Sequence, residues 1–231
     1  MSDLDILQEH AHLKFSQLWL STDSDLQAEA WAGETGAEWA ARNPTGVEGT
    51  NKSWQERFRI DKVMAIREAA HNIPKDTSWL EVGCSSGAHM RCVQAAGWQD
   101  IQGCDVNAEA IKEADRAVWA DARALPFEDD SFDVVTTSGA LMHMGPDERM
   151  TDCLMEMVRV SRKWLFLVEL YSEDGTLTSF GDLLPPAWMM AWDKWLPQKL
   201  PSEWRLVRGR VLVSPGERKA NPIAMMLLVK D

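Results

Sequence analysis

The spacing of hydrophobic positions changes near residue 78, and this change divides the chain into two regions. Before it, apolar residues recur at helical spacing or give way to glycine and proline, and no stretch alternates as a strand does. After it, short apolar runs alternate with amphipathic stretches, which is the pattern of an α/β sheet. We therefore predict one domain, in which residues 1–75 form a helical N-terminal cap and lid over residues 76–231.

The N-terminal region is predicted to hold two helices separated by a loop. Residues 6–19 carry apolar side chains at helical spacing, whereas the glycines and proline of 33–49 indicate loop structure. Ser53 is a candidate N-cap, and Glu56 three residues later completes a capping box. The helix that starts there is predicted to end near 71–72, before a proline.

Residues 78–170 are predicted to alternate strands with helices. The expected strands are 79–82, 101–105, 118–120, 132–137 and 164–168, and the expected helices end near 96 or span 108–117 and 146–161. The last of these strands is apolar throughout, as in a strand that is buried on both faces. This alternation predicts the α/β class: a Rossmann-like three-layer sandwich with a mostly parallel sheet and helices on both of its faces.

Residues 172–201 interrupt this rhythm and are predicted to be an insertion. Prolines bracket three tryptophans at helical spacing, which are Trp188, Trp192 and Trp195. Such side chains suit a core, a contact between copies in a homo-oligomer, or a clamp on a substrate. Two late strands, 204–213 and 223–229, then predict an antiparallel C-terminal hairpin that closes the sheet.

Composition and charge narrow the class of partner. Of the 231 residues, 45% are hydrophobic, and the formal net charge of −12 disfavours nucleic acid, whose phosphates such a surface repels. No apolar run approaches the length of about 20 residues that spans a bilayer, and the first residues lack a secretory signal. We therefore expect no membrane attachment and a cytoplasmic location. The 4 cysteines and 5 histidines show no metal-ligand or disulfide spacing, so no metal is predicted.

The strongest chemical signal is a glycine-bounded turn after the first predicted strand. Gly83 permits the sharp turn, and Gly87 lets the backbone pack closely beside a ligand at the start of the next helix. Asp105 ends the second strand, about 20 residues further on, where a carboxylate accepts hydrogen bonds from both hydroxyls of a ribose. Asp121 follows the third strand, where it can accept the amine of an adenine. Because the carboxyl ends of parallel strands meet at one crevice, these residues predict a nucleotide-like ligand.

The segments EVGCSSG, GCDVN, ADARALPFEDDSFDVV and SGALMHM, within residues 76–170, resemble the motif series of class I S-adenosylmethionine-dependent methyltransferases. The resemblance implies S-adenosylmethionine as the cofactor. It implies that the glycine turn lines the methionyl part, the second-strand acid binds the ribose and the third-strand acid binds the adenine. The implied cofactor-binding residues are Glu81, Gly83, Cys84, Gly87, Asp105, Val106, Asp121, Ala122 and Ser138. One departure is Ser85, which stands where the family has the middle glycine of its turn.

Two shorter segments resemble the methylases associated with pseudaminic acid biosynthesis: WAGETGAEWAARN at 31–43 and VELYS at 168–172. This resemblance implies a small-molecule acceptor, either a sugar or a sugar nucleotide. Trp31 is a further candidate for the cofactor site, because an aromatic face attracts the positive charge of a sulfonium. Packing of the N-terminal helices explains this tryptophan as well.

Three residues are candidates for the acceptor side of the site. His143 follows the fourth strand and has a side chain that titrates near neutrality, as a general base requires, although a packed histidine fits the same position. Glu169 and Tyr171 lie at the end of the fifth strand and are alternatives. Methyl transfer from a sulfonium depends mainly on alignment, so some acceptors need no base.

Three rival functions remain open at this point. Residues 83–87 also spell GxSxG, the nucleophile turn of α/β-hydrolases, but that fold places several strands before the turn. A nicotinamide-dependent oxidoreductase uses the same crevice and ribose acid, although Glu81 and Asp121 favour S-adenosylmethionine. A partner subunit without catalytic activity keeps the fold too, but has no need of the cofactor acids.

Overall fold

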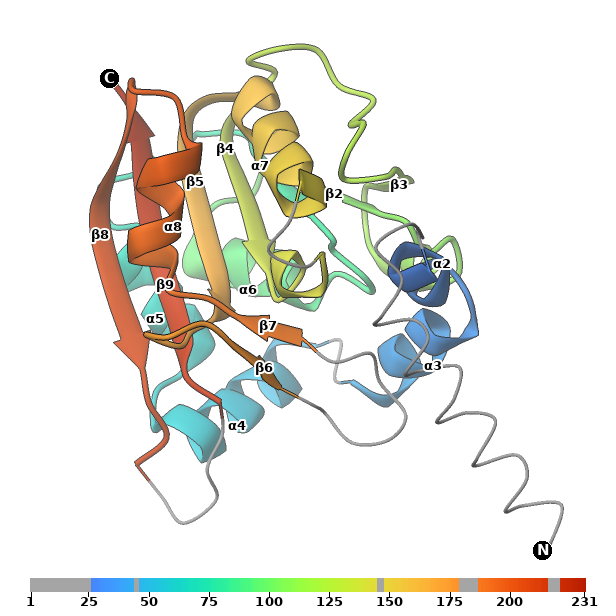
Figure 1. Cartoon of the computed structure of the whole chain (residues 1–231). Helices are drawn as coiled ribbons and strands as arrows, with labels where there is room; N and C mark the ends of the chain where they lie inside the picture. Colours follow the sequence, from blue (N-terminus) through green and yellow to red (C-terminus); the bar gives the residue numbers. More distant parts are fainter. Residues whose placement is uncertain (1–25, 44–45, 145–147, 179–186, 216–220) are drawn as a thin grey trace, which may run out of the picture.

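One seven-stranded sheet organises the molecule (Figure 1). The computed structural model describes residues 26–43, 46–144, 148–178, 187–215 and 221–231, so the helix predicted at 6–19 lies outside the described residues. The strand order is β3-β2-β1-β4-β5-β9-β8. The bounds are β1 Trp79–Val82, β2 Ile101–Asp105, β3 Ala117–Trp119, β4 Phe132–Ser138, β5 Ser161–Leu170, β8 Trp204–Leu212 and β9 Ile223–Lys230. Strands β1 to β5 pair in parallel, and β9 pairs antiparallel with both β5 and β8. The predicted Rossmann-like α/β fold with a closing antiparallel hairpin is confirmed.

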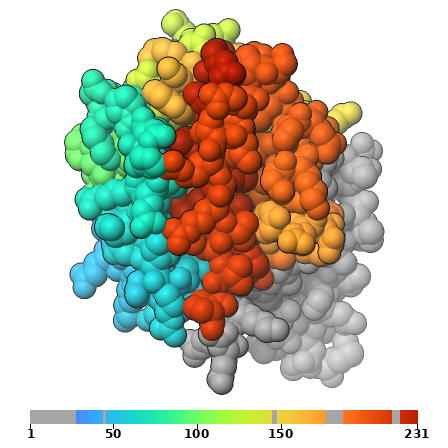
Figure 2. Space-filling view, turned by 90° about the vertical axis from the view of Figure 1, so that its left-hand side faces the viewer, coloured from blue at the N-terminus to red at the C-terminus, as the bar shows by residue number. Residues whose placement is uncertain are grey.

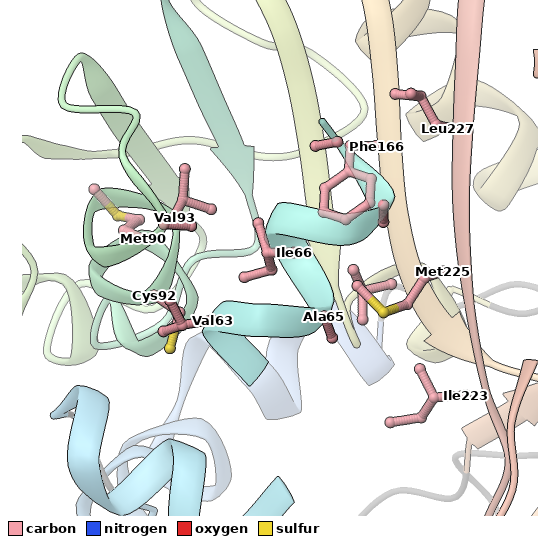
Figure 3. Close-up of a cluster of buried hydrophobic side chains, with 14 of the residues drawn as sticks. Val63, Ala65, Ile66, Met90, Cys92, Val93, Phe166, Ile223, Met225 and Leu227 are labelled. Carbon is pink, nitrogen blue, oxygen red and sulfur yellow. The ribbon is translucent and has the colours of Figure 1, made fainter. Parts of the chain in front are cut away.

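Two layers of helices bury the two faces of the sheet. On one face lie α4 (Val47–Phe58), α5 (Lys62–Ala69) and α6 (Ala88–Ala96), and on the other lie α7 (Glu148–Val160) and α8 (Trp192–Lys199). Successive side chains of β5 alternate between the layers: Phe166 joins the core beneath α5 and α6 (Figure 3), whereas Leu165 and Leu167 join the core beneath α7. This is why residues 164–168 are apolar without interruption.

The edge strand β8 differs from the inner strands. Most of its side chains are exposed, and Arg205, Arg208 and Arg210 among them form ion pairs or hydrogen bonds with neighbouring elements. Figure 2 shows the C-terminal strands as a stripe on this face, with the helices of α4 to α6 on one side and α8 on the other. The arginines make this edge polar, which discourages pairing with a further strand.

The prediction of loops over 33–49 is wrong, because that stretch is mostly helical. α2 (Leu26–Ala32) and α3 (Glu34–Arg42) precede α4, and Gly33 and Gly46 occupy N-cap positions rather than loops. The capping box is also wrong, since Ser53 lies inside α4. Arg59, with φ of 59°, ends α4, and the Asp61 carboxylate accepts a hydrogen bond from the backbone N–H of Met64 at 3.1 Å to begin α5.

Two further helix predictions need correction. Only a 3₁₀ turn, η1 (Ala110–Glu113), forms within 108–117, and Asn107 caps it by accepting the N–H of Glu109 and of Ala110. The three tryptophans of the insertion do not share a helix. Trp188 lies in β7 (Ala187–Met189), which pairs with β6 (Thr176–Thr178), and only the other two lie on α8. The backbone hydrogen bonds of this hairpin hold residue 188 extended.

The carboxyl ends of the parallel strands define one end of the molecule. In Figure 1, β4 and β5 run toward the end at which β6 and β7 lie, and α2 and α3 stand beside the carboxyl ends of β2 and β3. Loops that follow parallel strands at this end are where an open α/β sheet binds its ligands.

Two substitutions on α5 test the assignment of its buried face. Ile66 is fully buried, whereas Met64 on the same helix is 46% exposed. We expect Ile66→Ala to lower the free energy of unfolding by about 2 to 5 kcal/mol, through lost burial and the cavity left behind. The matched control, Met64→Ala, should change it by less than about 0.5 kcal/mol. Urea denaturation measures both, and equal effects of the two substitutions would contradict the orientation of α5.

Candidate functional site

A cavity of about 650 Å³ opens at the carboxyl ends of β1, β2, β4 and β5. Helices α2, α3, α4 and α5 supply the opposite wall. Of the residues singled out in the sequence, those that line this cavity are Trp31, Glu81, Gly83, Cys84, Asp105, Val106, Asp121, Ala122, Ser138, His143 and Glu169. Gly87 and Tyr171 do not line it. The fold therefore brings together residues that are up to 138 positions apart in the chain, from Trp31 to Glu169.

The glycine turn after β1 is built on left-handed backbone. Gly83 has φ of +74°, and a Cβ added there would lie 2.4 Å from the Cβ of Ala140, so only glycine fits. Ser85 has φ of 47° although it is not glycine, and its backbone N–H donates to Asp105 Oδ2 at 2.8 Å. Gly87 has φ of +81° at the N-cap position of α6 and packs on Ala114. Its role in the structure is conformational, and it does not line the cavity.

Asp105 sits at the centre of the site, at the end of β2. Its Oδ1 accepts the backbone N–H of Asn107 at 2.8 Å, and its Oδ2 accepts that of Ser85. Burial raises the pKa of this carboxyl, and the backbone donors of Asn107, Ser85 and Val106 oppose the rise. Because each carboxylate oxygen has two lone-pair directions, Asp105 retains acceptor capacity toward the cavity.

The Asp121 carboxylate is less available to a ligand than its position after β3 suggests. Arg123 donates to both of its oxygens, with Nη2 at 2.6 Å from Oδ2 and Nε at 3.0 Å from Oδ1. These hydrogen bonds lower the pKa of Asp121, so the carboxylate is ionised and already paired. An adenine amine would share this carboxylate with Arg123.

Glu81 and Lys62 are two buried ionisable residues that line the cavity. Glu81 is 2% exposed, and its Oε2 has no hydrogen-bond partner within the described residues. Burial raises the pKa of Glu81 to about 8; Lys62 and the Met90 N–H lower it, and Asp105 raises it further. Lys62, which the sequence analysis missed, is 5% exposed and donates to Ser138 Oγ at 3.1 Å. No local pattern marks Lys62, because a lysine at a helix start ordinarily faces solvent.

The raised pKa of Glu81 predicts a pH-dependent stability. The folded-state pKa of about 8 lies above the ordinary 4.5, so the native state keeps a proton that the unfolded chain releases between these values. Stability is therefore lost as pH rises through this window. We expect the unfolding free energy of the wild type to decline relative to that of Glu81→Gln, by at most about 1.4 kcal/mol per pH unit. Urea titrations across the window test this, and parallel curves would contradict the assignment.

A helical hairpin closes one side of the cavity. The ring of Trp31 in α2 lies 4.4 Å from that of His143, measured between centroids, and packs edge-on against Trp39 of α3 at 6.0 Å. Asn107 Nδ2 donates to the carbonyls of Trp31 at 2.7 Å and of Gly33 at 3.1 Å. One side chain thus joins the α2–α3 hairpin to the loop that follows β2.

The acceptor-side candidates differ in what the structure assigns to them. His143 is 8% exposed and lines the cavity beneath Trp31. Glu169 is 1% exposed, and its carboxylate accepts from Thr137 Oγ1 at 2.6 Å and from three successive backbone N–H groups, those of Ala140, Leu141 and Met142. These contacts make Glu169 an anchor for the loop after β4. Tyr171 packs beside α8, where Asp193 accepts its hydroxyl and raises its pKa, although burial is the larger cause.

Substitution of Glu169 tests whether its carboxylate anchors the loop after β4, as opposed to serving as a general base. In Glu169→Gln the amide group cannot accept at both ends, so the N–H of Met142 loses its acceptor. We expect the free energy of unfolding to fall by about 1 to 3 kcal/mol, as for a buried donor left unsatisfied. The matched control is the exposed Glu173→Gln, which should have no effect. Unchanged stability of Glu169→Gln would argue against the anchoring role.

The chain is similar to known proteins in part of its sequence and in its fold. Residues 80–165 match the family described as a methyltransferase domain. No curated protein sequence matches the chain significantly. Among solved structures, an S-adenosylmethionine-dependent methyltransferase from Methanosarcina mazei is similar, with 20% identity and a TM-score of 0.56 over 69% of this chain and 95% of that one.

Two further solved structures share the fold. Magnesium protoporphyrin IX methyltransferase from Synechocystis PCC 6803, with bound S-adenosylmethionine, has 13% identity and a TM-score of 0.60, covering 91% of this chain and all of that one (100%). A complex of the Haloferax volcanii Trm112 methyltransferase activator with a putative methyltransferase gives 15% identity and a TM-score of 0.58, over 84% and 96%.

These likenesses show the fold, which the chain shares with solved S-adenosylmethionine-dependent methyltransferases. The part of the chain that matches the methyltransferase-domain family begins in β1 and ends in β5, and so contains the glycine turn, Asp105 and Asp121. The hydrolase alternative is weakened by the same geometry. No strand precedes β1 in the described residues, as a hydrolase nucleophile turn would require.

The described part of the chain contains neither a membrane-spanning helix nor a cluster of metal ligands. None of its helices combines the length and apolarity needed to cross a bilayer. Within the same residues, no three side chains of His, Cys, Asp or Glu gather as metal ligands do. Burial raises the pKa of the Cys84 thiol in the cavity wall, so this sulfur is a neutral lining group rather than a nucleophile.

Proposed function

We propose that the protein transfers the methyl group of S-adenosylmethionine to a small-molecule acceptor in the cavity described above. The observation that carries the proposal is the convergence of the glycine turn, Asp105 and Asp121 on one cavity at the carboxyl ends of β1 and β2. The match to a methyltransferase-domain family and a similar structure with bound S-adenosylmethionine support this cofactor.

The cavity also offers unsatisfied polar atoms that suit the cofactor. Glu81 Oε2 and Trp31 Nε1 are buried and have no partner among the described residues, and both residues line the cavity. Buried polar atoms are normally paired. Glu81 Oε2 is therefore suited to accept a hydrogen bond from a ligand's ammonium, and Trp31 Nε1 is suited to donate one to a ligand's oxygen or nitrogen. When bound, S-adenosylmethionine supplies an electrophilic methyl group on a sulfonium.

The roles of the chain's own residues follow from their positions. Asp105 holds the ribose hydroxyls, Asp121 and Ala122 flank the adenine, and Val106 packs beside them. Gly83 and Cys84 leave room for the methionyl part next to Glu81 and Ser138. The aromatic face of Trp31 attracts the positive sulfonium, and His143 beneath it is the candidate for proton removal from an acceptor. Methyl transfer then depends mainly on the alignment that these contacts impose.

The N-terminal region acts as the cap and lid of this site. In the α2–α3 hairpin, Trp31 and Trp39 cover the cavity, and Asn107 fixes the hairpin by two hydrogen bonds. Excluding water strengthens the electrostatic contacts made inside. The volume of the covered cavity, which is that of a small-molecule site, supports a small-molecule acceptor. Its identity as a sugar rests on the sequence resemblance of 31–43 and 168–172 alone.

Asp105→Ala is the variant that tests the cofactor assignment. It should weaken binding of S-adenosylhomocysteine by about 1.5 to 3 kcal/mol, the cost of a lost hydrogen bond to a charged group. The matched control is Asp100→Ala, which removes an exposed carboxylate that pairs with Arg116 outside the cavity and should leave binding unchanged. Isothermal titration calorimetry measures both.

The same titrations include NAD, so that the result distinguishes the rival functions. Binding of S-adenosylhomocysteine alone is expected. Binding of NAD alone would assign the protein to the oxidoreductases, and binding of neither would favour a catalytically silent partner subunit. Normal binding by Asp105→Ala would refute the ribose assignment even if the wild type binds tightly.

A further inference from the structure

Two basic side chains of the cavity wall have no task in the proposed reaction. Arg57 lies in the last turn of α4 and Lys62 is the first residue of α5, and both line the cavity. Lys62 is almost wholly buried, and Arg57 is half-buried. Neither has a carboxylate within 4.0 Å in the part of the chain that the structure describes.

The contacts of both cations are with uncharged groups. The Lys62 Nζ donates to Ser138 Oγ and lies 5.3 Å from the ring centroid of Trp54. The guanidinium carbon of Arg57 lies 5.0 Å from the ring centroid of Phe58. Hydrogen bonds and aromatic faces of this kind replace only part of the hydration that a buried cation loses.

The two charges also oppose each other. Burial lowers the pKa of Arg57 and that of Lys62, and the positive charge of Arg57 contributes to lowering the latter. Two like charges held in a partly dry wall repel each other, and each loses hydration there. An anion between them would relieve both the repulsion and the loss of hydration.

Glu81 is the nearest candidate for that anion within the chain, but it does not serve as one. Its negative charge would favour the charged form of Lys62, yet no ion pair forms between the two side chains within 4.0 Å. Burial keeps the Glu81 carboxyl largely protonated near neutral pH, since its pKa is about 8. The cation at Lys62 is therefore left to be neutralised from outside the protein.

We propose that Arg57 and Lys62 form an anion-binding subsite that takes a carboxylate or phosphate group of a bound ligand. This inference rests on the proposed function for its setting and adds a chemical requirement to it. Two ligands could supply the group: S-adenosylmethionine, through the carboxylate of its amino-acid end, or the acceptor, through an acidic substituent. Lys62 touches Ser138 at the end of β4, where the methionyl part and the acceptor are expected to meet.

Calorimetry with two adenosine compounds and one free anion tests the subsite and distinguishes its occupants. S-Adenosylhomocysteine carries the amino-acid end, 5′-methylthioadenosine lacks it, and inorganic phosphate is the simple anion. The variants are Lys62→Met and Arg57→Met, which keep much of the side-chain length without the charge. Lys52→Met, at an exposed position of α4, is the matched control. Loss of a buried charge should not unfold the variants, and thermal melts confirm that they are folded.

Each outcome has a definite meaning. If the cofactor fills the subsite, the wild type prefers S-adenosylhomocysteine to 5′-methylthioadenosine by tenfold or more, the two variants lose this preference, and their affinity for 5′-methylthioadenosine is kept. If the acceptor fills it, the variants bind both compounds normally, but phosphate binds the wild type saturated with S-adenosylhomocysteine at least tenfold more tightly than it binds the saturated variants. The Lys52→Met control should match the wild type throughout.

Two results would overturn the proposal: variants that bind all three compounds as the wild type does, or variants that lose affinity for all three alike. Failure of the proposed function has a different signature. The wild type would then bind neither adenosine compound, whereas phosphate binding by the wild type and its loss in the variants would still support the anion subsite.

Discussion

The carboxylate of Asp105 is the interaction on which the architecture of the cavity depends. It accepts the backbone N–H of Ser85 from one loop and that of Asn107 from another, so that a single side chain sets the distance between them. Asn107 in turn caps η1 and holds the carbonyls of Trp31 and Gly33. The glycine turn, the loop after β2 and the α2–α3 hairpin are therefore one connected hydrogen-bond network.

Around this network the cavity wall carries ionisable groups that are poorly hydrated. Glu81 and Lys62 are buried, and Asp105 has a raised pKa because burial outweighs its three backbone donors. An interior of this kind is unfavourable in the empty protein and becomes favourable when a ligand with both positive and negative groups enters. Such a wall supports the proposed binding of a ligand that carries both positive and negative groups.

The sheet was predictable because its strands carry local signals. The run 164–168 is apolar on both faces, and the glycine turn marks the end of β1 without ambiguity. Helices α2 and α3 and the start of α4 were not predicted, since Gly33 and Gly46 suggest loops although they cap helices. The burial of Lys62 could not be predicted for a different reason. Its burial depends on a turn at Arg59 and on contact with Ser138, which lies 76 positions away.

For the site residues, too, some features were predictable from the sequence and others were not. Positions at strand ends, such as Asp105 and Asp121, follow from the pattern of the sheet. The partners of those side chains do not follow from the sequence pattern. Asp121 pairs with Arg123, and Glu169 accepts hydrogen bonds from the end of β4 and the loop after it, only in the folded chain. A sequence motif therefore locates the site, whereas the acceptor capacity left in each group depends on its neighbours.

The position of β9 in the sheet has a consequence for how the chain is made. β8 precedes β9 in sequence, yet its only hydrogen-bonded neighbour in the sheet is β9, which itself lies against β5. During synthesis, β8 emerges with no strand to pair with and must wait for residues 223–230. The five parallel strands, by contrast, have all their parallel partners among themselves once residue 170 is made, so the ligand crevice can form first. The last step is then the capture of a hairpin by the open edge of β5, a non-local pairing of the kind that slows folding.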